Sequence, residues 1–249
     1  MAASPAPSPG ADIRRPRPAR RPAFFGEGGL PRAPTHLDAL APIETAIETA
    51  VGLARAGKVD GALTLLEGLG PAIETHVRAS GLMGTLMTMA GRPEAALAWF
   101  ERSLALNPLQ PAMLTDLGNA LTRLEHPKAA TDAFDRALRL EPAYLPALNN
   151  RAGQRLELKD SQGALEDANT ALALNPQLAS AHRFRARALL MLDRNEEALA
   201  SVETAEALQP DNPDNPSIRA GVETAQGRFA EAAASLDRAV ALEPDNANY

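Results

Sequence analysis

Residues 111–144 read PAMLTDLGNALTRLEHPKAATDAFDRALRLEPAY, and this stretch contains a pattern that recurs along most of the chain. The clearest mark is the proline near its end. Proline stands at positions 108, 142, 176, 210 and 244, so successive prolines are separated by a constant interval, which we name the repeat period. Because proline disfavours the continuation of a helix, this constant interval predicts a structural unit that closes at the same place in each copy.

Two columns of small residues share this period. One column holds alanine in every copy, and the other holds only alanine or glycine. The first is Ala62, Ala96, Ala130, Ala164, Ala198 and Ala232, and the second is Ala50, Gly84, Gly118, Ala152, Ala186 and Ala220. Small residues at fixed places are expected where two helices cross closely, because a large side chain would hold them apart. The sequence therefore predicts helix pairs stacked along a line.

This pattern resembles the tetratricopeptide repeat (TPR) family, whose units are about 34 residues long. The residues that carry the resemblance are Leu117, Gly118, Leu121, Ala130, Phe134, Ala137 and Pro142. The resemblance covers residues 43–246 and implies an all-α fold, a right-handed superhelical solenoid of about six TPR helix-turn-helix repeats. Its units are residues 43–76, 77–110, 111–144, 145–178, 179–212 and 213–246.

Three of these units depart from the pattern. In the first unit, Gly70-Pro71 is expected to end the second helix early, because proline lacks a backbone donor. In the fourth unit, Arg151 replaces the usual leucine and Arg155 replaces the usual aromatic residue. In the last unit, Pro216 stands in the first turn of the first helix, which is therefore expected to start late or irregularly.

The segments outside the repeats have a different composition. Residues 1–42 contain nine prolines and six arginines, and we interpret them as a Pro/Arg-rich disordered tail that cannot form a packed core. A solvated tail is favoured over contact of its arginines with an acidic surface or nucleic acid. Residues 247–249 resemble the start of an incomplete further repeat. No capping helix follows, so we expect either a fragment of a longer chain or an end that packs on a partner or a second copy.

Composition and motifs argue against several classes of function. The chain has no cysteine, its four histidines lie without metal-ligand spacing, and His182 is expected to pack in the core. No phosphate loop or dinucleotide fingerprint occurs, so we predict no catalytic residue, no metal, no cofactor and no enzyme activity. The net charge of −6 argues against a nucleic-acid partner, and no apolar run has the length of a membrane span. We expect a cytoplasmic protein.

The family resemblance implies that the first helix of each unit lines a concave groove. Residues at its second, fifth, sixth and ninth places face that groove, and among them are Asp116 and Ser180. We predict a partner-binding site between the third and fifth units, formed by Thr115, Asn119, Asn149, Asn150, Arg183, Phe184 and Arg187. Arg183 and Arg187 would anchor an acidic or carboxylate-ended partner, while the asparagines would bond its backbone. The alternative is that both arginines are solvated or pair with Glu157 or other acids.

Two functions stay open at this point. The first is a non-catalytic scaffold that binds a peptide or protein in the concave groove. The second is the amino-terminal substrate-recognition arm of a larger enzyme, such as a glycosyltransferase or a sulfotransferase. Self-association through the uncapped last repeat is a further possibility. The lysine, asparagine and arginine pattern of chaperone-binding TPR domains is broken here by Thr115, Ser180 and Phe184, so we do not predict chaperone binding.

Overall fold

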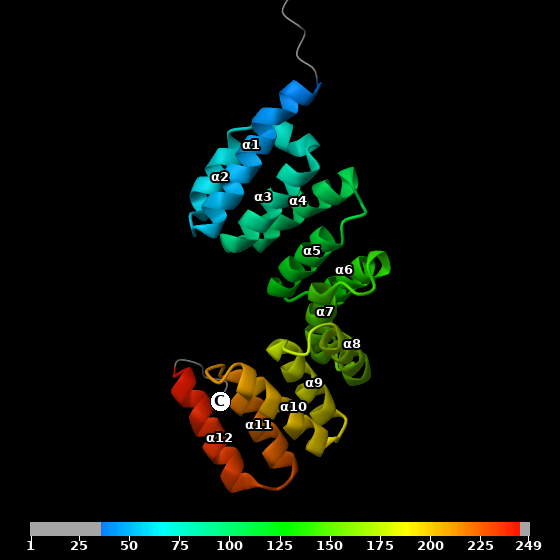
Figure 1. The fold of residues 1–249 in the computed structure, drawn as a ribbon, viewed down its shortest axis with the longest axis vertical. Coiled ribbons are helices and arrows are strands. Elements are labelled where there is room, and N and C mark those ends of the chain that lie inside the picture. Colours follow the sequence, from blue (N-terminus) through cyan, green and yellow to red (C-terminus); the bar gives the residue numbers. More distant parts are fainter. Residues whose placement is uncertain (1–35, 245–249) are drawn as a thin grey trace, which may run out of the picture. The chain divides into compact units, whose positions relative to one another are not determined.

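The structure is a computed structural model that describes residues 36–244, with side chains from Pro42 onward (Figure 1). It divides the chain into a short unit, Met1–Ala39, and a compact body, Leu40–Tyr249. Most of the predicted disordered tail lies outside the described residues. The helix α1 (His36–Arg55) nevertheless begins before the boundary that we predicted at residue 43, with Pro42 inside it. The predicted end of the tail at Pro42 therefore lies within this helix.

The described residues form twelve α-helices and one short 3-10 helix, with no β-strand among them, so the predicted all-α repeat fold is confirmed. The helices are α1, α2 (Val59–Glu67), η1 (Gly70–Thr75), α3 (Val77–Met89), α4 (Pro93–Leu106), α5 (Pro111–Arg123), α6 (Pro127–Leu140), α7 (Leu145–Glu157), α8 (Ser161–Leu174), α9 (Ala179–Met191), α10 (Asn195–Leu208), α11 (Asp214–Ala225) and α12 (Phe229–Leu242). The starts of α3, α5, α7 and α9 are separated by the repeat period.

The irregular units follow their prolines. Helix α2 ends at Glu67, and the next residues turn into η1, which contains Gly70 and Pro71. Helix α11 begins at Asp214, one residue after the place that the period gives, with Pro216 in its first turn. Both departures agree with the expected effect of proline on the start and end of a helix.

The turn between the two helices of each unit recurs with the same period. Positive φ angles between 58° and 75° occur there at Gly57, Gly91, Glu125, Lys159, Asp193 and Gly227. A left-handed residue allows the chain to reverse within a short turn, and glycine adopts this conformation without steric cost. Three units use a residue other than glycine, so the hairpin geometry, and not the local preference of the residue, decides the conformation.

The small columns lie where the two helices of a hairpin cross. A Cβ atom added to Gly118 would stand 2.4 Å from the ring of Phe134, and one added to Gly84 would stand 2.6 Å from Phe100. Phe100 and Phe134 are fully buried. The same place holds Ala168 and Val202 in the next two units, and there the column changes from glycine to alanine. The column therefore contains glycine where the facing side chain is an aromatic ring.

Gly118→Ala should lower the free energy of unfolding by about 2 kcal/mol, because the new methyl group would overlap the ring of Phe134. Gly52→Ala is the matched control, since nothing lies within 4 Å of the Cβ position of this exposed helical glycine. It should raise the free energy of unfolding by about 0.5 kcal/mol. Urea denaturation followed by circular dichroism measures both changes. Equal changes at the two positions would contradict the assigned crossing.

The apolar core is divided near the fourth unit. One cluster of buried side chains lies mainly between Ile47 and Leu148, and a second runs from Leu156 to Val222. Between these clusters, Arg151 of α7 donates two hydrogen bonds of 2.6 and 2.8 Å to Asp167 of α8. These ionic contacts occupy a place where apolar packing would otherwise be continuous.

The same network connects three helices. Arg151 also donates to Asp135 of α6 at 2.6 Å, and Arg155 donates to Asp167 at 2.9 Å and to the carbonyl oxygen of Gly163 at 2.9 Å. The side chain of Asp167 is only 5% exposed, so its charge needs these partners. Helix α7, which carries part of the candidate site, is thus held between α6 and α8 by charge.

The arginine of this network belongs to a further column. Arg151, Arg185 and Arg219 follow one another at the repeat period, and the preceding units hold Met83 and Leu117 at the same place. Arg185 donates hydrogen bonds to Asn169 of α8 and Ser201 of α10. Arg219 donates a hydrogen bond to Glu206 of α10. The last three units therefore replace an apolar side chain with a hydrogen-bonded guanidinium group.

Arg151→Ala should lower the free energy of unfolding by about 3 kcal/mol, because it removes the bidentate partner of the buried Asp167 carboxylate. The double variant Arg151→Leu/Asp167→Ala reproduces Leu117 and Ala133 of the preceding unit. Its free energy of unfolding should lie within about 1 kcal/mol of the wild type, since it removes the buried charge together with its partner. Equal losses in both variants, measured by urea denaturation, would show that the charged pair itself stabilises the fold.

Candidate partner-binding groove

A cavity of about 440 Å³, which we name the central pocket, opens among the first helices of the middle units. Helices α5, α7, α9 and α11 contact their neighbours in this series. The pocket is lined by Thr85, Thr88 and Met89 of α3, Phe100 of α4, Asp116, Asn119, Thr122 and Arg123 of α5, Asn150 and Gln154 of α7, and Phe184 of α9. Apart from Phe100, every lining residue lies on the first helix of its unit.

A chain of amide hydrogen bonds crosses this surface. Ser180 donates its hydroxyl proton to Oδ1 of Asn149 at 2.8 Å, and Asn149 donates to Oδ1 of Asn150 at 3.2 Å. Asn150 in turn donates to Oδ1 of Asn119 at 2.7 Å. The chain ends at Asn119, whose amide N–H groups have no partner among the described residues and are available to an acceptor in the pocket.

Asp116 is the carboxylate of the central pocket. Its Oδ2 accepts a hydrogen bond of 3.2 Å from the hydroxyl of Thr85. Burial raises the pKa of Asp116, and the hydrogen bond from Thr85 opposes this rise. Burial also raises the pKa of Tyr144, and the negative charge of Asp116 adds to that rise. In the described part of the chain, no basic side chain lies within 4.0 Å of the Asp116 carboxylate.

The predicted site residues fall into four groups. Asn119, Asn150 and Phe184 line the central pocket. Arg183 and Arg187 line a second pocket, of about 270 Å³, together with Phe184, Asp214, Ser217 and Ile218. Asn149 lines neither pocket but belongs to the amide chain.

Thr115 forms the fourth group, and its predicted place in the groove is wrong. Its side chain is buried, with 3% of the residue exposed, and its hydroxyl donates to the carbonyl oxygen of Pro111 at 2.9 Å. A threonine can be buried in a helix because its hydroxyl finds a partner one turn earlier. Thr115 therefore faces the packed side of α5, next to the buried Leu114.

The two predicted anchors already have partners. Arg187 donates to Oε1 of Glu157 at 3.0 Å. Arg183 donates to Oε1 of Gln209 at 2.8 Å, and its Nε lies 4.0 Å from the Asp214 carboxylate. Burial lowers the pKa of Arg183, and Asp214 opposes this decrease. These contacts match the alternative in which the arginines pair with Glu157 and other acids of the repeats.

Besides Phe100, the sequence analysis missed six residues of the central pocket, all of them on first helices. Three of them lie one repeat period before another pocket residue: Thr85 before Asn119, Thr88 before Thr122, and Met89 before Arg123. The period could therefore have identified this face of the helix, whereas only the second, fifth, sixth and ninth places of the third to fifth units were considered. The missed residues are Thr85, Thr88, Met89, Thr122, Arg123 and Gln154.

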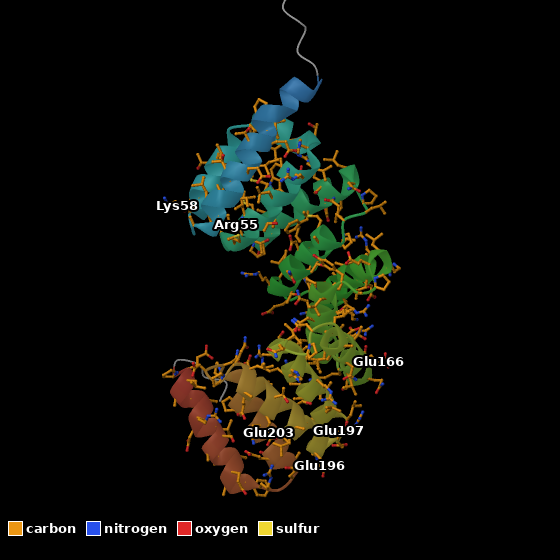
Figure 2. All side chains as sticks on the ribbon, in the orientation of Figure 1. Arg55, Lys58, Glu166, Glu196, Glu197 and Glu203 are labelled. Carbon is orange, nitrogen blue, oxygen red and sulfur yellow. The ribbon has the colours of Figure 1, made fainter. Side chains whose placement is uncertain are left out.

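Other chemistry is sparse over residues 36–244. No group of three metal-ligating side chains occurs there, and none of the helices in that range is long and apolar enough to cross a membrane. His182 is half-buried: its Nε2 contacts the carbonyl oxygen of Pro176 and its Nδ1 is buried, so its predicted core position is met only in part. The carboxylates Glu166, Glu196, Glu197 and Glu203 lie on the second helices α8 and α10 and line neither pocket (Figure 2).

The tetratricopeptide repeat model matches residues 89–144 and 151–213, which cover most of the chain from α4 to α10. The chain therefore carries repeats of the TPR family. No curated protein sequence matches it significantly. The helical hairpins, which recur at a constant period, agree with this assignment.

Solved TPR structures share the fold. MamA from Desulfovibrio magneticus RS-1, from residue 41 to its end, is 20% identical over 69% of this chain and 97% of its own, with a TM-score of 0.61. YrrB, described as a TPR protein with an unusual peptide-binding site, is 20% identical over 73% of this chain and 93% of its own, with a TM-score of 0.59. TTC0263 of Thermus thermophilus is 26% identical over 69% of this chain and 93% of its own, with a TM-score of 0.57. These similarities show a common helical architecture.

Asp116→Asn should change how the free energy of unfolding of this protein depends on pH. Because the pKa of Asp116 is raised above its ordinary value of 3.8 in the folded protein, the folded state binds this proton more tightly than the unfolded state. Protonation of Asp116 therefore stabilises the folded state. This stabilisation is complete below the pKa of Asp116 in the unfolded chain and is lost as the pH rises through its pKa in the folded protein. The variant should therefore be similar to the wild type at pH 4 and more stable at pH 7.

Urea denaturation at both pH values measures this difference. Asp132→Asn is the control, because Asp132 is an exposed carboxylate on α6 that lines neither pocket. It should follow the wild type at both pH values. An Asp116→Asn variant that is less stable than the wild type at pH 7 would contradict the assigned cost of burying this carboxylate.

Proposed function

We propose that the TPR repeats of this chain form a non-catalytic scaffold that binds an extended segment of a partner protein along the surface of the first helices. The observation that carries this proposal is the composition of the central pocket, which gathers amide and hydroxyl groups from three successive repeats and an aromatic ring from the next. A TPR scaffold supports a role in protein interaction in general. The extended segment and the groove as its binding site are the specific parts of the proposal.

The pocket offers the groups that an extended backbone needs. A peptide that forms no hydrogen bonds of its own presents one N–H and one C=O at nearly every residue. Asn119 can donate to a peptide carbonyl, and the amide chain through Asn150 fixes the orientation of its oxygen. Phe184 and Met89 add apolar surface for side chains of the partner.

The second pocket extends this surface toward α11. Phe184 lines both pockets, so one bound segment can contact both. Arg183 and Arg187 would meet an acidic or carboxylate group there, exchanging their contacts with Asp214 and Glu157 for that group. The peptide-binding site described for YrrB, which has the same architecture, supports a peptide as the ligand of this chain.

The central pocket brings few ionisable groups together. Asp116 and Arg123 are the ionisable side chains among its described lining residues. A cytoplasmic location and self-association through the last repeat remain predictions from the sequence.

A display library of random dodecapeptides, selected on the immobilised full chain, tests the proposal. Enriched peptides are measured by fluorescence anisotropy on the wild type and on Asn150→Ala. The variant removes the amide at the centre of the hydrogen-bond chain and should weaken binding about tenfold. Thr170→Ala, at an exposed residue of α8 outside both pockets, should leave the affinity unchanged.

A second variant separates binding from folding. Thr122→Arg places a long side chain with high helix propensity in the central pocket and should block the peptide while the thermal midpoint stays close to that of the wild type. The proposal is wrong if no peptide is enriched over an empty support, or if enriched peptides bind Thr122→Arg as tightly as the wild type.

A further inference from the structure

The buried and half-buried carboxylates of the described repeats differ in whether an arginine of the fold pairs with them. Asp167, with 5% of its side chain exposed, pairs with Arg151 and Arg155. Glu206, with 14% exposed, pairs with Arg219 and Arg238, and Glu223 lies 3.9 Å from Arg219 and accepts a bond from Ser235. Each of these acids has a guanidinium partner supplied by the fold, as is usual for a buried charge.

Asp116 has no such partner. It is half-buried, and its side chain accepts a hydrogen bond of 3.2 Å from Thr85, whose hydroxyl also lies 3.2 Å from the carbonyl oxygen of Gly81. One shared hydroxyl proton leaves most of the acceptor positions of a carboxylate unused, since it can accept about four hydrogen bonds. The unused positions belong to a group that lines an open cavity.

The basic residue of the same pocket does not fill this role. Arg123 lies seven residues after Asp116 on α5, which separates the two by about 10 Å along the helix axis. Arg123 is exposed and forms no ion pair in the described part of the chain. The cavity of about 440 Å³ thus presents a carboxylate that lacks a cation.

We propose that the central pocket receives a lysine or arginine side chain of the bound segment, with Asp116 as its counter-ion. This inference rests on the proposed function and names the residue class that the groove selects. Asn150 and Gln154 line the same cavity, and the side-chain oxygen of Gln154 can accept an N–H group of a basic side chain. Met89 and Phe184 can cover its aliphatic part.

The partial burial of Asp116 has an energetic consequence that fits this assignment. A carboxylate that is desolvated without a cation disfavours the folded state, and a ligand cation would reverse this cost when it binds. A basic side chain in the central pocket and an acidic one near Arg183 and Arg187 can belong to one segment, because Phe184 lines both pockets. The preferred partner would then carry both charges in a fixed order.

The test uses peptides enriched from the dodecapeptide library on the full chain. The selected sequences should share a lysine or arginine at one fixed position. That residue is replaced with glutamine, and the affinities of the parent and neutral peptides are measured on the wild type, Asp116→Asn and the control Asp132→Asn. On the wild type and the control, the neutral peptide should bind at least tenfold more weakly than its parent.

On Asp116→Asn the two peptides should bind with affinities that differ less than threefold, while the helical spectrum and thermal midpoint stay at or above those of the wild type. On the wild type, the affinity for the parent peptide should fall as the salt concentration rises, and this dependence should be weaker on Asp116→Asn.

The outcomes distinguish this inference from the proposed function. If peptides bind in the pocket, as shown by their loss on Thr122→Arg, but share no basic position or retain their charge preference on Asp116→Asn, the counter-ion role is wrong and the peptide-binding function stands. If no peptide is enriched, both proposals are wrong.

Discussion

The close approach of the two helices within each repeat is the constraint on which the rest of this structure depends. It is set by a small residue on one helix and the side chain that lies against it, as in Gly118 with Phe134 and Gly84 with Phe100. A left-handed residue in the turn, such as Lys159 or Gly91, then reverses the chain within a few residues. With both conditions met in each copy, successive hairpins stack and place their first helices next to one another.

The fourth repeat satisfies this constraint with charge instead of apolar packing. Arg151 and Arg155 occupy places that hold leucine side chains in the third repeat, and Asp167 receives hydrogen bonds from both. Buried ion pairs of this kind contribute little net stability compared with apolar side chains, but they tolerate few alternative arrangements. Helix α7 is thereby fixed between α6 and α8, and with it Asn150 and Gln154, which face the central pocket.

Charge is treated differently on the two sides of the first helices. On the side that packs against the second helices, arginines of the first helices pair with Asp167 of α8 and Glu206 of α10. In the central pocket, Asp116 has a single hydroxyl, and the open amide of Asn119 lies on the same helix. Burying the charge of Asp116 without a cation costs stability, so this carboxylate beside a cavity is more readily explained by a ligand than by folding. This contrast is the physical basis for assigning a binding role to that surface.

The sequence by itself determined the period, the helix pairs, the crossing columns and the prolines that disturb α2 and α11, because each of these is a local feature that can be compared between copies of the repeat. It also indicated which helices line the groove. Only the tertiary structure decided that Thr115 is buried, that Arg187 pairs with Glu157, and that Asp116 lacks a cation. Those properties depend on side chains from different repeats: the sequence left pairing with Glu157 as one of two outcomes for Arg187, and the contact between the repeats decided it. A period fixes the face of a helix on which a residue lies, whereas the contacts that it makes depend on the neighbouring repeats.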